Sequence, residues 1–405
     1  MSLKVKSFFT NPLLFFLIII NYLKPEGLLA IAPQTVSHFF SVWDKFFGVP
    51  IVMLCLLALI QDKQCLCKDT ILYFGYRMAA TLLVTCFATH LFTGGGVFRH
   101  LWMLSAIWYL TSALKYSFQK TISRLAVLLS VLVVANLISI LVFPNGMYHD
   151  ANQNNYLLGY NNGHIVVLMP ALFFSYQRWY YRKKRLQLII TWVAVYTGVF
   201  LTHSTTTKIG LLVLLILIAT IQFPILRKYL FSWKTTAAII AILFFGVVVL
   251  REQGVLPVNV VHLLDKDASF TARTVLWDRS LNSIRIHPWF GIGDSTEINI
   301  GLFALVQEHA YAHNEILDVL VKSGFIGLIL YLNCIANSIR TIKGRENLHN
   351  KIWLAFMTSY WISMMVESYS NYKFYYFYFV MLIFPRVAVF HNRKNNPYLE
   401  GMDRG

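Results

Sequence analysis

Hydrophobic segments long enough to cross a bilayer alternate with short polar segments along almost the whole chain. Apolar runs of this length, separated by basic or polar connections, are typical of transmembrane helices. We expect about twelve such spans, and they lie at 8–32, 40–60, 70–92, 100–114, 125–143, 164–180, 186–203, 208–226, 235–250, 313–336, 352–369 and 374–391. The pattern therefore predicts an all-α integral membrane protein in which residues 1–405 form a single polytopic membrane domain.

The first expected span contains the sequence Lys24-Pro25-Glu26-Gly27. Proline lacks a backbone N–H and its ring clashes with the preceding helical turn, so it interrupts helices. We therefore expect this span to break near its outer end.

The basic residues fall in alternate connections between the apolar runs. If Lys4 and Lys6 lie in the cytoplasm, every second loop is rich in lysine and arginine, while the opposite loops are neutral or mixed. Membrane proteins retain such loops on the cytoplasmic side. We therefore expect both termini in the cytoplasm. The formal charge of +17 reflects this bias, and a nucleic-acid partner is not expected.

Composition agrees with a membrane location. The chain is 57% hydrophobic and only 13% charged, whereas soluble domains carry about 25% charged residues. The five cysteines show neither a paired framework nor the spacing of a zinc site.

One connection is much longer than the others. It runs from about 251 to 312, lies on the outer side of the expected topology and contains the turn sequence "HPWFGIGDS". Long loops between regular elements are usually functional. We expect this extracytoplasmic loop to contribute to a site, together with the helix that follows it at 313–336.

The helix after the large loop carries unusual polar groups. His313 stands at its outer end, and Gly324 and Gly327 fall on the same side at 100° per residue. Small residues on one stripe allow a neighbouring helix to approach closely. Asp318 and Lys322 are four residues apart, so we expect them to neutralise each other inside the protein.

The role of His313 has two readings from spacing alone. It is either an interfacial histidine bonded to loop backbone, or a group that transfers protons, since histidine titrates near neutral pH.

The motif H-N-x9-G-x-x-G is formed by His313, Asn314, Gly324 and Gly327. It resembles the signature of the O-antigen ligase and Wzy-type polysaccharide polymerase superfamily. The preceding "ARTVLWDRSLNSIRIHPWFGIGDS" is similar to that family's outer-loop pattern of Arg, Trp, His-Pro and Gly-x-Gly. Motif similarity covers residues 271–330, and the rest of the chain resembles the family in topology.

The resemblance implies a reaction and a location. Members transfer glycan from a polyprenyl-diphosphate carrier to an acceptor hydroxyl at the outer face of a bacterial cytoplasmic membrane, inner or plasma. His313 would be the catalytic base. The diphosphate is a good leaving group and mainly needs cations to hold its charge. The resemblance thus implies a metal-independent glycosyltransferase without a cofactor.

The resemblance also implies substrate-binding residues. Arg273 matches the loop arginine before the tryptophan and is expected to bind the diphosphate, with Arg279 as a runner-up. Asn314, next to His313 in the motif, is expected to contact substrate.

Family members usually carry a second arginine at the outer end of a mid-chain span, but here the sequence reads "LTHSTTTKIGLL". Thr205 occupies the expected arginine position. Lys208 or His203 is therefore expected to substitute, although a lysine cannot make the bidentate contact of an arginine.

Two further polar segments contain groups that suit a ligand. The "DKD" at 265–267 mimics a metal-binding motif of nucleotide-sugar transferases, but those substrates are cytosolic and this loop is expected outside. The segment 144–163 is rich in asparagine, glycine and tyrosine, which suit sugars. It resembles an outer segment found in polymerases more than in ligases, and a merely hydrophilic loop is the alternative.

The sequence therefore favours a polysaccharide polymerase of a capsular, O-antigen or exopolysaccharide pathway. Its expected partners are a polyprenyl-diphosphate-linked oligosaccharide, membrane lipid and, as a candidate, a chain-length regulator. An O-antigen ligase that acts on lipid A-core is the nearest alternative. A lipid-linked oligosaccharide flippase, which is not an enzyme, is a more distant one, because it would not need a histidine and arginine constellation in a large outer loop.

Overall fold

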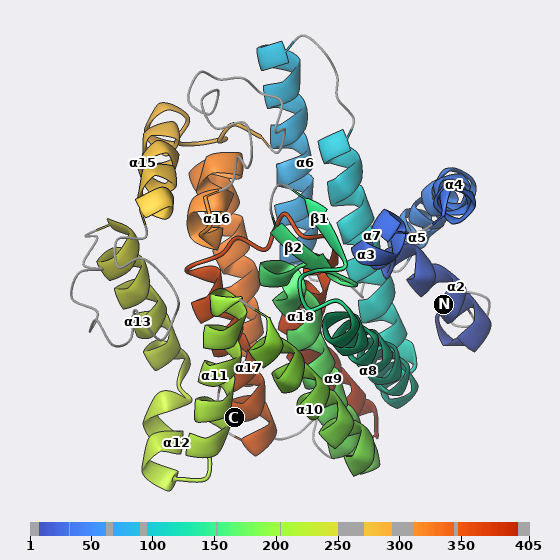
Figure 1. The fold of residues 1–405 in the computed structure, drawn as a ribbon. Helices are drawn as coiled ribbons and strands as arrows, with labels where there is room; N and C mark the ends of the chain where they lie inside the picture. Colours follow the sequence, from blue (N-terminus) through green and yellow to red (C-terminus); the bar gives the residue numbers. More distant parts are fainter. Residues whose placement is uncertain are drawn as a thin grey trace.

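The computed structural model describes most of the chain. The described residues are 8–31, 33–61, 68–89, 95–150, 153–202, 204–249, 271–293, 312–343 and 347–395. Over these residues the protein is a bundle of helices with one small antiparallel sheet at one end (Figure 1).

The first third of the chain is helical. Its elements are α2 (Pro12–Tyr22), α3 (Glu26–Ile31), α4 (Gln34–Trp43), η1 (Asp44–Gly48), α5 (Val49–Gln61), α6 (Lys68–Thr89), α7 (Gly95–Tyr116) and α8 (Phe118–Val142). The expected break in the first span is confirmed, because α2 ends before Pro25 and α3 begins after it. Asn11 caps α2 by accepting hydrogen bonds from the backbone N–H groups of Leu13 and Leu14.

A three-stranded sheet follows α8, which an all-α expectation did not include. It consists of β1 (Tyr148–Asp150), β2 (Gln153–Tyr156) and β3 (Gly159–Tyr160) in the order β1-β2-β3, and both pairs are antiparallel. Gly159 has a φ of +96°, a conformation open to glycine at little cost. The described residues of the segment 144–163 therefore include regular structure, and its role in binding sugar stays a prediction.

The remaining elements complete the bundle. They are η2 (Asn161–His164), α9 (Ile165–Arg182), α10 (Arg185–Leu201), α11 (Thr205–Thr220), α12 (Pro224–Leu230), α13 (Trp233–Leu243), η3 (Phe244–Val249), α15 (Thr271–Ile286), α16 (Glu315–Ile342), α17 (Leu348–Met364), η5 (Lys373–Tyr375) and α18 (Tyr376–Asn395). The expected large loop contains α15, which packs on α16. Its residues 251–270 and 294–311 lie outside the described part of the chain.

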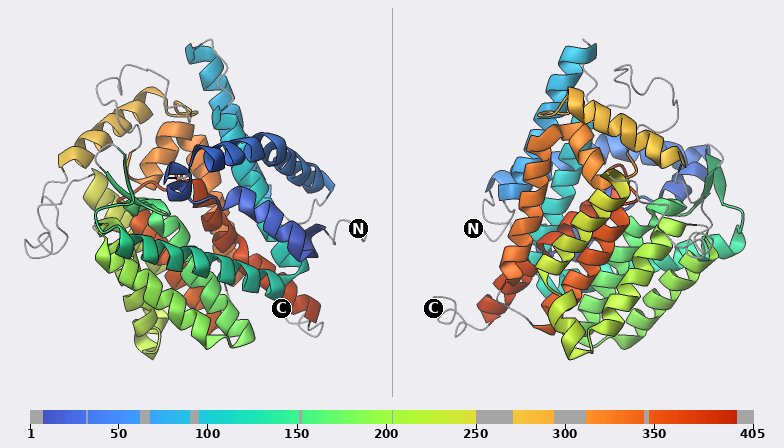
Figure 2. Two further views of the ribbon diagram at one scale, coloured as in Figure 1. Left: turned by 45° about the vertical axis from the view of Figure 1, so that its right-hand side comes forward. Right: turned by 90° about the vertical axis from the view of Figure 1, so that its left-hand side faces the viewer.

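Helix α18 lies in the middle of the bundle. It contacts α7, α9 and α16. In its most apolar stretch, within Lys373–His391, 78% of the residues are buried inside the protein. The other faces of the bundle are apolar and exposed: Phe200 is 73% exposed and Ile225 74%. Exposed apolar surface of this extent suits contact with lipid rather than water. Figure 2 shows the helices of the bundle from two further directions.

Four helices within the described residues are long and apolar enough to cross a membrane. They are Gln34–Leu57, Phe118–Val142, Glu315–Ile342 and Lys373–His391. A fifth is possible by length if the bent pair Pro224–Leu230 and Trp233–Gly246, which meet at 63°, forms one span. The chain is an all-α membrane protein by this measure. The count of twelve spans stays a prediction.

Candidate functional site

His313 immediately precedes α16 and has an unusual backbone. Its φ is +46°, in the left-handed region that costs a side-chain-bearing residue about 1–3 kcal/mol. Asn314 follows as the N-cap: its Oδ1 accepts from the backbone N–H of Leu317 at 3.0 Å, and its Nδ2 donates to the carbonyl of Met365 at 2.8 Å. Asn314 is fully buried. Its side chain therefore fixes the start of α16, and its expected contact with substrate stays a prediction.

The imidazole of His313 is paired with a carboxylate. Its Nδ1 lies 2.8 Å from Oε1 of Glu367, which is fully buried, while the His313 side chain is 19% exposed. When Nδ1 carries the proton that bonds this carboxylate, the lone pair of the neutral ring is on Nε2. This is the arrangement by which an acidic side chain orients a histidine for proton transfer.

Glu367 is itself held by neighbours. Its Oε2 lies 3.4 Å from Nδ2 of Asn162, and its Oε1 accepts from the backbone N–H of Ser368 at 3.3 Å. The Oδ1 of Asn162 accepts from Ser204 Oγ at 2.8 Å, and Ser204 is the N-cap of α11. The carboxylate thus joins three segments that are far apart in sequence: the end of α17, the loop after the sheet and the start of α11.

Glu315, in the first turn of α16, binds the loop after α17. Its carboxylate accepts hydrogen bonds from the backbone N–H groups of Tyr369 at 2.8 Å and Ser370 at 3.2 Å, and from the hydroxyl of Tyr375 at 2.8 Å. An acidic group is also favoured at a helix N-terminus by the helix dipole. These bonds fix the 365–375 loop against α16, and with it the position of Glu367.

The expected neutralisation of Asp318 by Lys322 is confirmed. Lys322 Nζ lies 2.8 Å from Asp318 Oδ2, and the two side chains are 9% and 2% exposed. Ser370 Oγ donates to the same carboxylate oxygen at 2.6 Å, and Lys322 donates to Oδ1 of Asn371. The pair is therefore a buried structural link between α16 and the 365–375 loop.

We expected both motif glycines, Gly324 and Gly327, to allow close approach of a neighbouring helix, and only Gly327 does so. Gly324 has a φ of +62° and a ψ of −167°, so it breaks α16 into two helical segments. A Cβ there would lie 2.3 Å from the backbone of Trp289, so Gly324 admits a loop and not the neighbouring helix that we expected. Gly327 does face a helix, since its Cβ position lies 3.4 Å from Tyr76 on α6.

The loop admitted by Gly324 is the "HPWFGIG" turn. The backbone N–H groups of Ile292 and Gly293 donate to the carbonyls of Val321 and Lys322 at 2.8 and 3.0 Å, and Phe325 N–H donates to Pro288 at 2.7 Å. These bonds satisfy backbone groups that the helix break leaves open. The outer-loop motif and the helix motif are therefore one interlocked unit.

Two of the expected cations, Lys208 and Arg279, have described side chains. Lys208 is half-buried on α11, one turn beyond the Ser204 cap, and Arg279 is half-buried on α15 with its Nη1 enclosed and without a hydrogen-bond partner among those residues. Arg273 lies in the first turn of α15, but its side chain is outside the described part of the chain, as is His203. Their roles stay predictions.

Glu367 and Asn162 were not predicted as site residues. Glu367 lies in "ESYSNYK", between two apolar runs, and Asn162 lies in the asparagine-rich segment 144–163. A carboxylate at the end of an apolar run is itself a signal, because ionisable groups in such a position are costly and usually functional. No cluster of three or more potential metal ligands occurs in the part of the chain that the structure describes, and the expectation of a metal-independent site stays a prediction.

The fold and this geometry define a helical membrane protein with a carboxylate-oriented histidine at one end of an apolar helix. Residues 189–332 match the family model described as O-antigen ligase, a range that includes His313 and both motif glycines and ends before Glu367. This part of the chain, 144 of its 405 residues, is therefore similar to the O-antigen ligase family. Its members are ligases or polymerases that act on lipid-linked oligosaccharides in membranes. No curated protein matches the chain.

Proposed function

We propose that the protein is a polysaccharide polymerase. It transfers glycan from a polyprenyl-diphosphate carrier to the non-reducing end of a carrier-linked repeat unit, at the outer face of a bacterial cytoplasmic membrane. The observation that carries the proposal is the 2.8 Å contact between His313 Nδ1 and Glu367, at the outer end of the motif helix of a chain that matches the O-antigen ligase family over residues 189–332.

In this proposal Nε2 of His313 accepts the proton of the acceptor hydroxyl as its oxygen attacks the anomeric carbon of the donor sugar. The glycosidic bond forms, the bond from that carbon to the diphosphate oxygen breaks, and the diphosphate leaves with the bonding electrons. The proton then passes from the imidazolium to the diphosphate or to water. Glu367 positions the ring and stabilises its charged form.

The diphosphate needs positive charge, and the candidates are Arg273, Arg279 and Lys208. An arginine fork matches phosphate oxygens in a bidentate manner, so Arg273 and Arg279 suit this role best. Cationic side chains can supply the charge stabilisation that a metal provides in other transferases. A metal-independent reaction is therefore part of the proposal.

We propose a polymerase rather than a ligase because the segment 144–163 resembles an outer segment found in polymerases more than in ligases. We assign the polar segment 144–163 to the acceptor sugar. Asn162, near the C-terminal end of this segment, contacts Glu367. An acceptor held there has its hydroxyl near His313. A polymerase accepts a second carrier-linked repeat unit, whereas a ligase accepts lipid A-core. A chain-length regulator is a proposed partner of the polymerase.

Deletion of the gene tests the proposal. We expect the surface glycan or the carrier pool to be capped at single repeat units, and the wild-type gene to restore polymer. Long carrier-linked polymer that is never attached to lipid A would show a ligase instead. Accumulation of repeat units on the cytoplasmic side of the membrane would show a flippase.

The proposed topology has twelve spans with both termini in the cytoplasm. Cys67 should then escape labelling by a membrane-impermeant maleimide in intact cells, while cysteines introduced at Asn152 or Ser295 should react. Labelling of Cys67 under these conditions would contradict the topology.

A further inference from the structure

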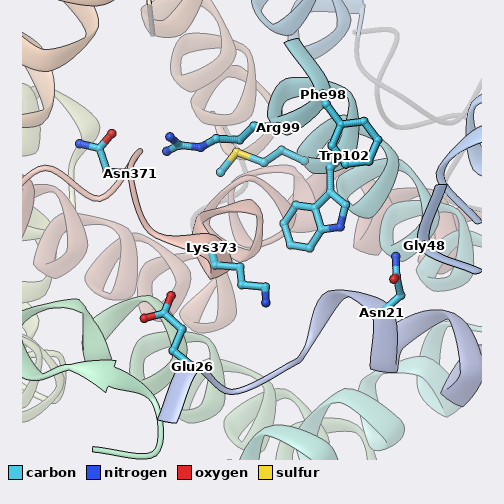
Figure 3. A pocket seen from close by; sticks show the side chains of 9 residues that line it. Asn21, Glu26, Gly48, Phe98, Arg99, Trp102, Asn371 and Lys373 are labelled. Carbon is cyan, nitrogen blue, oxygen red and sulfur yellow. The ribbon is translucent and has the colours of Figure 1, made fainter. Parts of the chain in front are cut away.

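A cavity of about 470 Å³ lies beside the 365–375 loop. This volume is within the usual range for small-molecule sites. Its lining comes from α2, α3, η1, α7 and the segment that leads from α17 into η5. The lining residues are Asn21, Glu26, Gly48, Phe98, Arg99, Trp102, Met103, Asn371 and Lys373 (Figure 3).

Two amide groups in this lining lack hydrogen-bond partners. Nδ2 of Asn21 and Nδ2 of Asn371 are both enclosed by protein and have no acceptor among the described residues, and Asn21 is only 3% exposed. An unsatisfied buried donor costs about 1–3 kcal/mol. Both residues line the cavity, and a small shift of either side chain would bring its donor to an acceptor of a ligand bound there.

The orientation of the Asn371 amide is determined by a neighbour. Lys322 is a donor only, so the amide oxygen of Asn371 must face its ammonium group. The NH₂ group is then directed away from Lys322. The buried ion pair of α16 therefore sets which hydrogen-bonding group Asn371 presents.

The charged lining groups are of both signs and are partly engaged by the protein. Arg99 donates to the carbonyl of Ser370, Lys373 donates to the carbonyl of Lys24 at 3.4 Å, and Glu26 adds a carboxylate. Donors and acceptors of both kinds match the hydroxyl groups of a polyhydroxyl ligand. In Figure 3 the ring of Trp102 and the chain of Lys373 lie between Asn371 and Asn21. An aromatic face with donors and acceptors of both kinds is suited to a sugar ring.

The cavity also adjoins the proposed acceptor segment. Gly159 of β3 lies directly against Glu26, because a Cβ on Gly159 would be 2.3 Å from Glu26 Oε2. The backbone N–H of Gly27 donates to the carbonyl of Leu157 at 3.0 Å. The sheet, the cavity and the 365–375 loop that carries Glu367 are therefore continuous.

We infer that this cavity is a saccharide-binding subsite for the acceptor repeat unit. It holds sugars beyond the one that reacts, through the amides of Asn21 and Asn371 and the indole of Trp102. The inference rests on the proposed function for the identity of the saccharide, while its binding chemistry does not depend on His313.

Calorimetry on the purified full-length protein in nanodiscs tests the inference. The probe is the oligosaccharide released by mild acid from the carrier lipids of a strain that lacks this gene. We expect Asn21→Leu to weaken binding about three- to tenfold, the value of a lost hydrogen bond, and Trp102→Ala to weaken it about tenfold or more. Trp233→Ala is the matched control, because Trp233 is 39% exposed on α13, and it should bind as the wild type does.

The outcomes separate this inference from the proposed function. Unchanged affinity in well-folded Asn21→Leu and Trp102→Ala proteins would overturn the subsite, even if His313→Ala abolishes polymerisation. Weakened affinity in both variants would support it, even if His313→Ala retains activity. Tight binding of undecaprenyl phosphate that is lost in the same variants, with no oligosaccharide binding, would show a lipid headgroup site instead.

Discussion

The polar groups around His313 and those around the Asn21 cavity lie on two sides of the same loop, but they differ in how far they are satisfied. In the cluster of His313, Glu315, Asp318, Lys322 and Glu367, each carboxylate has at least two partners. In the cavity, two amide donors have none among the described residues. Complete buried polar networks hold their groups rigidly, whereas a buried donor without a partner is free to bond a water molecule or a ligand. The first region therefore fixes geometry, and the second is the one that we propose binds a saccharide.

The largest effect should come from His313. We expect His313→Ala to insert normally and to lower the rate of glycan transfer by about 10²–10⁴, the usual loss for one positioned base. Polymer length and turnover in membranes of a complemented deletion strain measure this. The matched control is His38→Ala, because His38 is exposed on α4. Near-normal polymer from a well-expressed His313→Ala protein would remove His313 from the mechanism.

The buried ion pair should show the next effect, on stability. Lys322→Met leaves Asp318 charged and without its cation, which costs about 3–5 kcal/mol. The double variant Asp318→Leu, Lys322→Met should recover most of this loss, because no uncompensated charge remains. Thermal unfolding of the three proteins in the same detergent measures it. Equal melting temperatures for the single and double variants would contradict a structural pair.

Glu367 should affect turnover more than binding. Glu367→Gln keeps the shape but replaces a charge-assisted hydrogen bond worth about 1.5–3 kcal/mol, so kcat should fall about ten- to a hundredfold. KM for the carrier-linked substrate and the melting temperature should stay close to wild type. A matching fall in melting temperature, or a rise in KM with kcat unchanged, would show that Glu367 does not act through His313.

A substitution in the cavity should not lower the stability of the protein, in contrast to a substitution in the His313 cluster. Asn21→Leu removes an amide whose Nδ2 has no acceptor, so the free energy of unfolding should stay the same or rise by about 1 kcal/mol. Thermal unfolding without ligand measures this small effect. A clear loss of stability would mean that the Asn21 amide supports the fold, and would weaken the contrast between the two regions.

Local spacing allowed much of this architecture to be predicted from sequence. The helix after the large loop and the Asp318–Lys322 pair follow from apolar periodicity and a four-residue spacing, and the break at Pro25 follows from proline chemistry. The break at Gly324 could not be predicted in this way, because helical periodicity assumes an unbroken helix. Its cause is a loop that begins more than thirty residues earlier at His287.

The partners of His313 required the folded chain. Glu367 is 54 residues away and Asn162 is 205 residues from Glu367. No local pattern relates residues at such distances, and polar loops near membrane surfaces are common. The orphaned amides of the cavity were equally hidden, because an unmet hydrogen bond is a property of the packed structure and not of a residue type.

The interlock between Gly324 and the Pro288–Gly293 turn has a consequence for engineering. The hydrogen bonds of this turn fix the 251–312 segment to the helix that follows His313, and they divide its sequence into two parts, residues 251–287 and 294–312. Segments exchanged between related enzymes on either side of the turn should leave the position of His313 unchanged. We expect substrate preference to change when one of the two parts is exchanged and the other is kept. A chimera in which the Pro288–Gly293 turn is displaced from α16 should be inactive.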